Sequence, residues 1–257
     1  MKKPITIIKV GGKIVEERES LLALLDRFSA VEGNKVLIHG GGRSATKIAE
    51  KLGIESRMID GRRVTDEATL QVVTMVYGGL VNKNIVAGLQ ARGTNALGLT
   101  GADCNIVHAH KRPVKDIDWG FVGDVDGADG KMLAALIEQG IVPVVAPLTH
   151  DGNGNMLNIN ADTMAAETAK ALAPYFDVTL TYCFEFPGVM RNPDDESSVI
   201  PLITPDTYCA LKEDGTVSGG MIPKLDNAFN ALAGGVTKVI ITRADAIDGK
   251  QGTHIVQ

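Results

Sequence analysis

Two kinds of hydrophobic pattern alternate along this chain from one end to the other. Short apolar runs of the length of buried strands predict β-strands, and stretches with apolar residues every three or four positions predict helices between them. This alternation indicates an α/β fold with a mainly parallel sheet and helices on both of its faces. The predicted strands are Ile5–Val10, Lys35–Ile38, Ala96–Leu99, Val142–Pro147, Val178–Cys183 and Lys238–Thr242. The predicted helices are Leu21–Phe28, a segment capped by Ser44 that runs through Leu52, Asp66–Ala91, Asp162–Leu172 and Lys224–Ala233.

Length and composition are those of a globular protein with one sizeable core. The chain has 257 residues, 44% of them hydrophobic, and its composition changes little, so residues 1–257 are predicted to form one domain whose lobes share a sheet. The formal net charge of -5, without clustered Lys and Arg, argues against nucleic acid as a partner. Apolar runs such as Gly140–Leu148 fall short of the roughly 20 residues that a membrane span needs.

The N-terminus and the cysteines predict a cytoplasmic protein. The first strand begins at Ile5, so no apolar signal segment is expected before it. The cysteines, 3 in number, are widely spaced, form no Cys-x-x-Cys pair and suit reduced thiols. No metal site is predicted, because His108 and His110 share a strand face but no third ligand follows at metal spacing.

The first candidate site combines a lysine in an apolar strand with two glycines. Lys9 lies in the strand Ile5–Val10 and precedes Gly11 and Gly12. Lysine is rarely buried without a partner, and a ligand phosphate at the carboxyl end of a parallel strand could be that partner. The alternative is an edge-strand lysine that extends to water. No Gly-x-x-x-x-Gly-Lys-Ser/Thr loop occurs, which excludes a P-loop enzyme.

A second glycine-rich segment, Gly40–Gly42, follows the second predicted strand and opens a helix. Glycines let a ligand approach the backbone, and the free N–H groups of a helix N-terminus bind anions. The spacing also fits a loose dinucleotide fingerprint with Asp60 downstream, which leaves a nicotinamide-dependent oxidoreductase as an alternative. Against that alternative, such a fingerprint normally follows the first strand of the fold.

Polar segments farther along the chain offer groups for an acidic small molecule. Arg62 and Arg63 stand beside a glycine turn, where they either anchor a carboxylate bidentately or form a solvated surface. Asn158 and Asn160 are expected on one side of a strand. Asp162 follows them and either caps its helix or holds lysines near a phosphate.

Lys224 stands near the start of a predicted helix, just after the glycine turn Ser218–Gly220. A lysine there is unfavourable against the helix dipole. A bound anion beside Lys224 explains the position, although exposed lysines also tolerate it.

The order of these segments is more specific than any one of them. Lys9–Gly12, His39–Gly42, Gly61–Thr65, Asn158–Asp162 and Gly219–Lys224 together resemble the amino-acid kinase family, and the resemblance covers nearly the whole chain. It implies a three-layer αβα sandwich that uses ATP and Mg²⁺. The Gly-x-Arg-Val-Thr and Asn-x-Asn-Ala-Asp elements imply phosphorylation of the side-chain carboxylate of N-acetyl-L-glutamate in arginine biosynthesis. N-succinyl-L-glutamate is the alternative substrate.

The resemblance also implies residue roles, within an acylglutamate lobe of residues 1–175 and an ATP lobe of residues 176–257. Lys9 and Lys224 would act on the transferring phosphoryl group, and Asp162 would orient both lysines. The implied substrate-binding residues are Gly41, Gly42, Arg63, Asn158 and Asn160. The implied nucleotide-binding residues are Gly11, Gly12, Glu185, Gly188, Ser218, Gly219 and Gly220.

Elementary chemistry agrees with that assignment. A glutamate side chain, with a pKa of about 4.3, is already ionised at neutral pH, so the reaction needs no catalytic base. The obstacle is repulsion between an anionic nucleophile and an anionic phosphate. Two lysines, Mg²⁺ and glycine-rich amide groups reduce that repulsion and hold the reacting atoms in line.

The chain departs from the family pattern in its later part. Cys183–Val189 replaces the usual aspartate-containing Asp-Val-x-Gly-Val stretch, and Glu185 is the candidate substitute for the aspartate. A non-catalytic sensor on the same fold is a further alternative, but it need not keep Lys9, Asp162 and Lys224, all of which are present.

The resemblance further implies a homodimer that is insensitive to arginine. Arginine-inhibited relatives carry an additional N-terminal helix that links dimers into hexamers, and the first strand here begins at Ile5. The apolar stripe of the helix Asp66–Ala91 is the predicted dimer interface, with ordinary core packing as the alternative interpretation.

Overall fold

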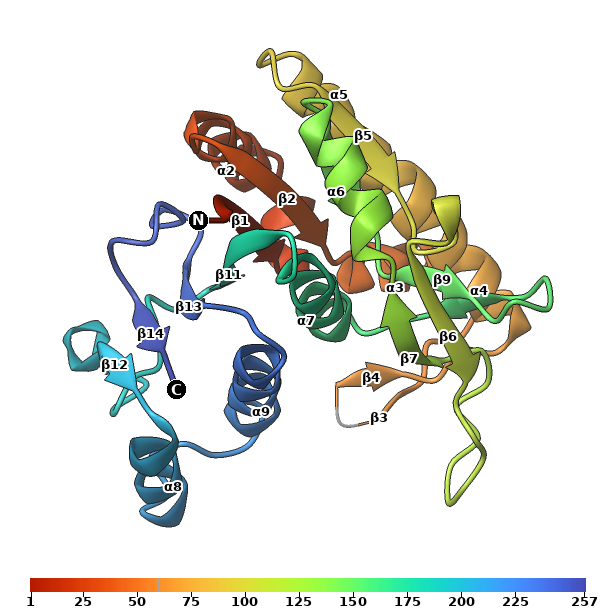
Figure 1. Ribbon diagram of the computed structural model, residues 1–257. Coiled ribbons are helices and arrows are strands. Elements are labelled where there is room, and N and C mark those ends of the chain that lie inside the picture. Colours follow the sequence, from red (N-terminus) through yellow and green to blue (C-terminus); the bar gives the residue numbers. More distant parts are fainter. Residues whose placement is uncertain (60) are drawn as a thin grey trace.

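The computed structural model describes residues 1–59 and 61–257, and its middle layer is an eight-stranded sheet (Figure 1). The strand order is β12-β14-β13-β11-β1-β2-β8-β5, and each pairing is parallel except that of β13 with β14. The strands are β1 (Lys3–Val10), β2 (Asn34–His39), β5 (Ala96–Leu99), β8 (Val142–Val145), β11 (Phe176–Phe184), β12 (Leu202–Ile203), β13 (Lys238–Arg243) and β14 (Thr253–Ile255).

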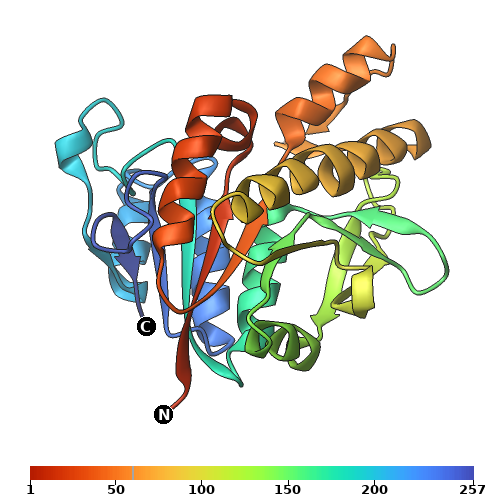
Figure 2. The ribbon, with the colours of Figure 1, turned by 90° about the horizontal axis from the view of Figure 1, so that it is seen from above.

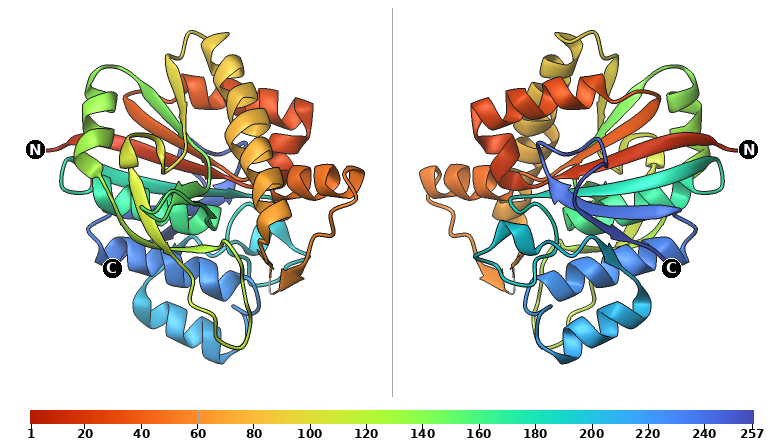
Figure 3. Two further views of the ribbon diagram at one scale, coloured as in Figure 1. Left: turned by 90° about the vertical axis from the view of Figure 1, so that its right-hand side faces the viewer. Right: turned by 90° about the vertical axis from the view of Figure 1, so that its left-hand side faces the viewer.

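Helices cover both faces of this sheet, so the predicted three-layer αβα architecture is confirmed (Figures 2 and 3). One face carries α6 (Gly130–Glu138), α7 (Ala161–Leu172) and α9 (Met221–Ala233), and α8 (Pro205–Glu213) packs on α9 through the ring of Tyr208. The other face carries α1 (Gly12–Glu16), α2 (Arg18–Ala30), α3 (Gly42–Lys51) and a long helix made of α4 (Glu67–Val73), η1 (Thr74–Val81) and α5 (Asn82–Gln90). Short helical turns η2 (Asp103–Asn105) and η3 (Glu196–Ser198) complete the helices.

The side chains of strand β1 alternate between the two cores, and this alternation sets the direction of Lys9. Side chains alternate between the two faces of a strand, and Ile5 and Ile7 are buried in the cluster that contains α7 and α9. Ile8 and Val10 are buried in the cluster on the opposite face. Lys9 therefore continues the row of Ile5 and Ile7 and is directed toward α7, with only 7% of its surface exposed.

A second, four-stranded sheet of order β10-β9-β6-β7 lies beside the main one. Its strands were not predicted as a sheet, because they are short and belong to two hairpins, β6 with β7 and β9 with β10. The pairing of β6 with β9, which joins the two hairpins, links segments that are far apart in the chain. A small hairpin of β3 with β4 stands apart. These strands are β3 (Met58–Ile59), β4 (Arg62–Arg63), β6 (Val107–Lys111), β7 (Gly123–Ala128), β9 (Leu148–His150) and β10 (Met156–Asn158).

The cap predicted at Ser44 is wrong. Helix α3 begins at Gly42 with Gly41 as its N-cap, and no side chain caps it. The free N–H groups at this end are therefore left for a partner outside the helix.

The long helix is the one described stretch, Glu67–Gln90, that is apolar and long enough to cross a membrane by composition alone. Its buried side chains pack in the core under the main sheet, which accounts for its hydropathy. For Val73 and Tyr77, ordinary core packing is the correct interpretation of the predicted apolar stripe, whereas Leu80 of the same stripe is exposed. The middle of the helix, Thr74–Val81, is π-helical, a form often found at functional sites.

Candidate active site

Two cavities open at the edge of the main sheet where β1, β2 and β11 end. Parallel strands bring their carboxyl ends to one edge, and ligands of open α/β sheets bind there. The substrate cavity, as we name the first, has a volume of about 360 Å³ and the nucleotide cavity about 350 Å³. Gly40, Gly41 and Gly42 line both cavities and form the wall between them.

The buried lysine of β1 has its counter-ion in α7. Lys9 Nζ lies 2.6 Å from Asp162 Oδ1, and the two side chains are 8% and 17% exposed. Asp162 does not cap α7, because Asn160 does: the Asn160 Oδ1 accepts hydrogen bonds from the backbone N–H groups of Asp162 and Thr163. The expectation that Asn158 and Asn160 share one side of a strand is therefore wrong, since β10 ends at Asn158.

The second predicted lysine lies beside the first. Lys224 is in the first turn of α9, and its Nζ lies 3.9 Å from the centre of the Phe184 ring, while Lys9 Nζ lies 5.2 Å from the same ring. An aromatic face attracts cations, so Phe184 helps to hold two like charges close together. Phe184 was not recognisable in the sequence as a site residue, because an aromatic residue at the end of a buried strand is ordinary core composition.

Burial lowers the pKa of Lys224 below that of a free lysine, and Lys9 lowers it further, whereas Asp162 and Glu185 oppose the shift. Without a ligand, the chain therefore loses this positive charge at a lower pH than an ordinary lysine would. For the kinase activity that the resemblance implies, we expect kcat/KM for ATP to fall on the alkaline side, and kcat to fall only at higher pH, because bound phosphates favour the charged lysine.

The measurement is a pH profile of both constants for the native chain and for Lys224→Arg. Arginine stays protonated throughout this range, so the alkaline limb of kcat/KM should disappear in the variant. A limb that persists unchanged in Lys224→Arg would assign the titration to another group.

The glycine loops lie against one another. A Cβ on Gly12 would be 3.8 Å from Gly42 N and 4.0 Å from Gly41 N, and a Cβ on Gly40 would be 3.4 Å from Gly12 N. A Cβ on Gly41 would meet the Tyr77 ring at 2.8 Å, closer than side chains approach. Backbone N–H groups of two loops thus converge beside the lysines, an arrangement that binds anions.

A buried histidine fixes the second loop. His39 is fully buried, and burial lowers its pKa to about 4, so the ring is neutral at pH 7. Its Nδ1 is 2.7 Å from Gly40 O and its Nε2 is 3.0 Å from Asn82 Nδ2, which also donates to Val144 O. With Nδ1 as the donor, the ring ties the loop to the long helix and to β8.

Arg63 lies at the bottom of the substrate cavity with 7% of its surface exposed. It donates hydrogen bonds of 2.8–2.9 Å to Gly42 O, Ser56 Oγ and Thr46 Oγ1. Its Nε is buried and has no partner among the described residues. The residue lines the cavity, and its guanidinium group suits a ligand carboxylate there.

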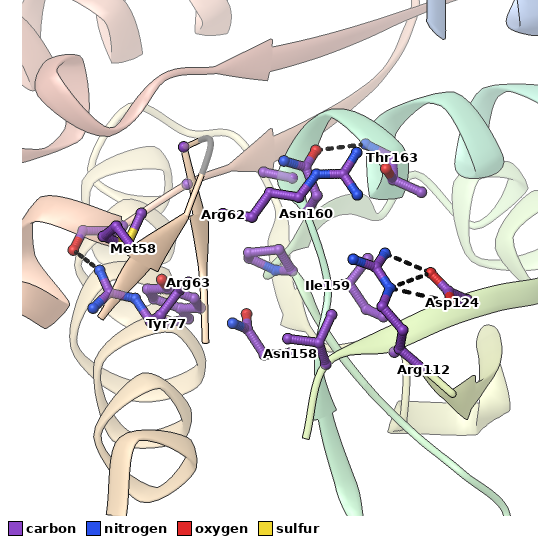
Figure 4. Close-up of a pocket in the computed structure, with 18 residues that line it drawn as sticks. Met58, Arg62, Arg63, Tyr77, Arg112, Asp124, Asn158, Ile159, Asn160 and Thr163 are labelled. Carbon is purple, nitrogen blue, oxygen red and sulfur yellow. Dashed lines mark hydrogen bonds and ion pairs between the residues drawn. The ribbon is translucent and has the colours of Figure 1, made fainter. Parts of the chain in front are cut away.

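Asn158 lines the same cavity and donates a hydrogen bond of 2.9 Å to Thr65 Oγ1. Figure 4 shows Arg63 and Tyr77 on one side of the cavity and Arg112 with Asp124 on the other, while Arg62 extends between them toward Asn160 and Thr163. Sequence reasoning missed Tyr77, Arg112 and Asp124 because their segments carry no motif.

Only some of the predicted nucleotide-binding residues line a cavity in the structure. Gly11, Gly12 and Glu185 line the nucleotide cavity, where the Glu185 carboxylate lies 3.4 Å from Lys13 Nζ and 3.5 Å from Arg43 Nη2. Gly188 lies away from the cavity lining and packs against β14, where a Cβ would meet Thr253 Oγ1 at 2.7 Å. Ser218, Gly219 and Gly220 form the turn before α9 and line neither cavity. Asp60 lies outside the described residues.

The chain belongs to the amino acid kinase family, whose sequence profile matches residues 4–243. In this chain the match covers the eight-stranded sheet, the two lysines beside the Phe184 ring and most of the lining of both cavities. Within the family the chain belongs to the acetylglutamate kinases. It is 65% identical over 255 residues to the acetylglutamate kinase of Bacteroides thetaiotaomicron, with 99% of both chains covered, and 65% identical to that of Phocaeicola vulgatus, also with 99% of both covered.

A solved structure supports the same fold. The crystal structure of smu.665 from Streptococcus mutans UA159 has a TM-score of 0.81 and 29% identity, and 98% of each chain is covered. The chain is therefore an enzyme that transfers a phosphoryl group, and the nicotinamide-dependent oxidoreductase and non-catalytic sensor alternatives are wrong.

Proposed function

We propose that this enzyme transfers the γ-phosphoryl group of ATP to the side-chain carboxylate of N-acetyl-L-glutamate and forms an acyl phosphate and ADP in arginine biosynthesis. One observation carries the proposal: two cavities of similar size share the wall Gly40–Gly42, and charged groups stand beside it. Lys224 lines the nucleotide cavity, and Asp162, the ion-pair partner of Lys9, stands between two residues that line the substrate cavity, Ala161 and Thr163. An acylated amino acid in one cavity and ATP in the other would present their reacting ends to each other there.

The chemistry requires charge neutralisation and alignment. The attacking carboxylate is already ionised at neutral pH, and the neutral His39 is too deeply buried to serve as a base. Lys9 and Lys224 would neutralise the transferring phosphoryl group, and the N–H groups of Gly11, Gly12, Gly41 and Gly42 would hold the phosphates and the attacking carboxylate. Asp162 would fix Lys9 in place.

Substrate recognition would depend on the far end of the same cavity. Arg63 would bind the α-carboxylate, and Asn158 would contact the acylated amino group, since both residues line the cavity. Asn160, as the cap of α7, would support the position of Asp162. Glu185 would contact the nucleotide in the nucleotide cavity. The turn Ser218–Gly220 would act indirectly, because it sets the position of Lys224 at the start of α9. Gly188 would also act indirectly, by letting its loop pack closely against β14.

The residues present fit a nucleotide-bound Mg²⁺. In kinase sites Mg²⁺ is held chiefly by phosphate oxygens with one or two carboxylates, and Asp162 is the carboxylate beside the lysines. The ion would supply further charge neutralisation on the phosphates. We assign residues 1–175 to the acylglutamate lobe and 176–257 to the ATP lobe, and we place the enzyme in the cytoplasm.

The test is ATP turnover with hydroxylamine, which traps an acyl phosphate as a hydroxamate. We expect hydroxamate and ADP in equal amounts with N-acetyl-L-glutamate and no product with free glutamate or aspartate. ADP without hydroxamate would show that the acceptor is not a carboxylate and would overturn the proposal.

We also propose that two copies pair along the outer side of the long helix and the neighbouring edge strand. Met75 and Leu80 are 55% and 50% exposed, and Leu97 on the edge strand β5 is 38% exposed. An apolar surface beside an open sheet edge favours association with another chain.

Leu80→Glu should convert the dimer to a monomer in sedimentation velocity, because a charge would be buried in the interface. Leu202→Glu, at a comparably exposed leucine on β12 near the opposite edge of the sheet, should leave the dimer intact. A native chain that sediments as a monomer or a hexamer would contradict the proposed dimer.

A further inference from the structure

One carbonyl of the glycine wall faces the core and is held there. Gly40 O lies 2.7 Å from Nδ1 of His39, which is fully buried at the end of β2. The N–H group of the same glycine is bound as well, because Gly40 N donates to Val10 O at 3.1 Å. Both backbone groups of Gly40 are therefore fixed, one by a side chain of the core and the other by the end of β1.

The fixed carbonyl sets the direction of the next N–H group. Gly40 O and Gly41 N belong to one peptide unit, which is planar and trans, so its C=O and N–H bonds point in opposite directions. Because Gly40 O faces the buried ring of His39, the N–H group of Gly41 points away from that ring. Gly41 N donates no hydrogen bond to the described residues, and Gly41 lines both cavities. This donor is thus free for an anion at the wall.

The partners of the His39 ring determine which of its nitrogens carries the proton. Burial lowers the pKa of His39 to about 4, so at pH 7 the ring is neutral and has a single N–H group. A carbonyl oxygen can only accept, so Nδ1, which lies against Gly40 O, carries that proton. Nε2 is then an acceptor, and it lies 3.0 Å from Asn82 Nδ2.

Asn82 is held so that its amide donates to the ring. Its Nδ2 also donates to Val144 O at 2.9 Å, and the reversed amide would place an oxygen against that acceptor. Asn82 Oδ1 is buried without a hydrogen-bond partner in the described part of the chain, and it packs on the edge strand β5, where a Cβ on Gly98 would overlap it. The amide cannot turn without moving that strand, so it keeps the proton of His39 on Nδ1.

We propose that Asn82 and His39 are positioning residues for phosphoryl transfer: Asn82 holds the Nδ1–H form of His39, and His39 holds the Gly40–Gly41 peptide so that Gly41 N–H is aimed at the reacting anions. In the proposed function, on which this role rests, the N–H groups of the wall bind the phosphates and the attacking carboxylate. Neither side chain lines the substrate or the nucleotide cavity, so both act through the wall. A donor oriented before charge develops stabilises the transition state, so its misalignment lowers kcat more than binding.

His39→Asn and His39→Gln form a matched pair of variants. Asparagine places an amide N–H at about the position of Nδ1, beside Gly40 O, whereas glutamine reaches the position of Nε2 and places no donor at that carbonyl. Both replace the buried ring by a primary amide, so both should lower the melting temperature to a similar extent. In the hydroxamate assay we expect kcat to fall by about 10²-fold or more in His39→Gln, the effect of losing one aligned donor, and by less than about tenfold in His39→Asn. KM for ATP and for the acylglutamate should change little in either variant.

Nitrogen NMR of the imidazole rings tests the proton position in the native chain. The signals of His39 are those that disappear in His39→Asn, and we expect its Nδ1 to be protonated and its Nε2 unprotonated at pH 7. In Asn82→Asp a proton should appear on Nε2, because the carboxylate beside it can only accept. His108→Asn and His108→Gln, at an exposed histidine that lines neither cavity, are the controls and should leave kcat unchanged.

The outcomes separate this role from the proposed function. Equal kcat values in His39→Asn and His39→Gln would show that the ring only fills space, and would overturn the role of His39. A native ring protonated on Nε2 would also overturn it, because Gly40 O would then lack its donor. An unprotonated Nε2 in Asn82→Asp would overturn the role of Asn82. No hydroxamate from any acylated glutamate with the native chain, while ATP still binds, refutes the proposed function itself.

Discussion

Lys9→Met should lower kcat by about 10³-fold while the chain stays folded. The loss of one group that stabilises developing charge costs roughly 10²–10³-fold in turnover, and here the change also leaves the Asp162 carboxylate without its 2.6 Å partner beside an anionic phosphate. Methionine is close to lysine in length and suits the apolar row that Ile5 and Ile7 begin. The defect should therefore appear in kcat and much less in the melting temperature.

The measurement is steady-state turnover with saturating ATP and acylglutamate, together with thermal unfolding. The double variant Lys9→Met with Asp162→Asn should recover part of the lost rate, because it removes the unpaired carboxylate. Lys250→Met is the control: this lysine is 82% exposed in a surface pair with Asp248, which is 53% exposed, and such pairs contribute little. A loss below about tenfold in Lys9→Met would remove Lys9 from the reaction centre.

Arg63→Met should raise KM for the acylglutamate by about 10²–10³-fold. Truncating one partner of a buried, hydrogen-bonded charge pair costs roughly 3–4 kcal/mol, and each 1.4 kcal/mol is tenfold in affinity. Arg63 is buried, and it lines the substrate cavity. The α-carboxylate is common to every acylated glutamate, so the increase should be the same for N-acetyl and N-succinyl compounds.

A loss of the same size for both compounds would identify the α-carboxylate as the group that Arg63 binds. KM is measured by titrating each acylglutamate at saturating ATP, with Arg57→Met as the control at an exposed arginine that does not line the substrate cavity. The control should change KM by no more than about twofold. An unaltered KM for ATP is also expected, and a parallel rise in both KM values would indicate that the glycine wall has moved, since Arg63 donates to Gly42 O.

The sequence predicted the main sheet well, because its central strands are continuous apolar runs. Strands β1, β2 and β11 are buried on both faces, so their hydrophobicity is recognisable without knowledge of their partners. Lys9 was recognisable for the same reason, since a charge interrupts such a run. The four-stranded sheet was missed because β9 and β10 are short and because β6 and β9, which join its two hairpins, are far apart in the chain.

The candidate site was predicted on its glycine side and missed on its opposite wall. Glycines at strand ends have few structural explanations, so the loops could be assigned to anion binding from the sequence. Arg112 and Asp124 are ordinary polar residues of a hairpin until pairing of β6 with β7 brings their side chains together. Asn160 and Asp162 are both good helix caps, so only three-dimensional geometry could assign the cap to one and the lysine to the other.

The glycine wall shared by the two cavities makes the two ligands thermodynamically dependent on each other. Gly40–Gly42 cannot change position for one occupant without changing the surface offered to the other. Coupling between two binding sites is reciprocal. If bound nucleotide changes the dissociation constant of the acylglutamate by some factor, bound acylglutamate changes the dissociation constant of the nucleotide by the same factor. Two independent titrations by calorimetry, each with the second ligand absent and then saturating, must therefore return one and the same coupling free energy.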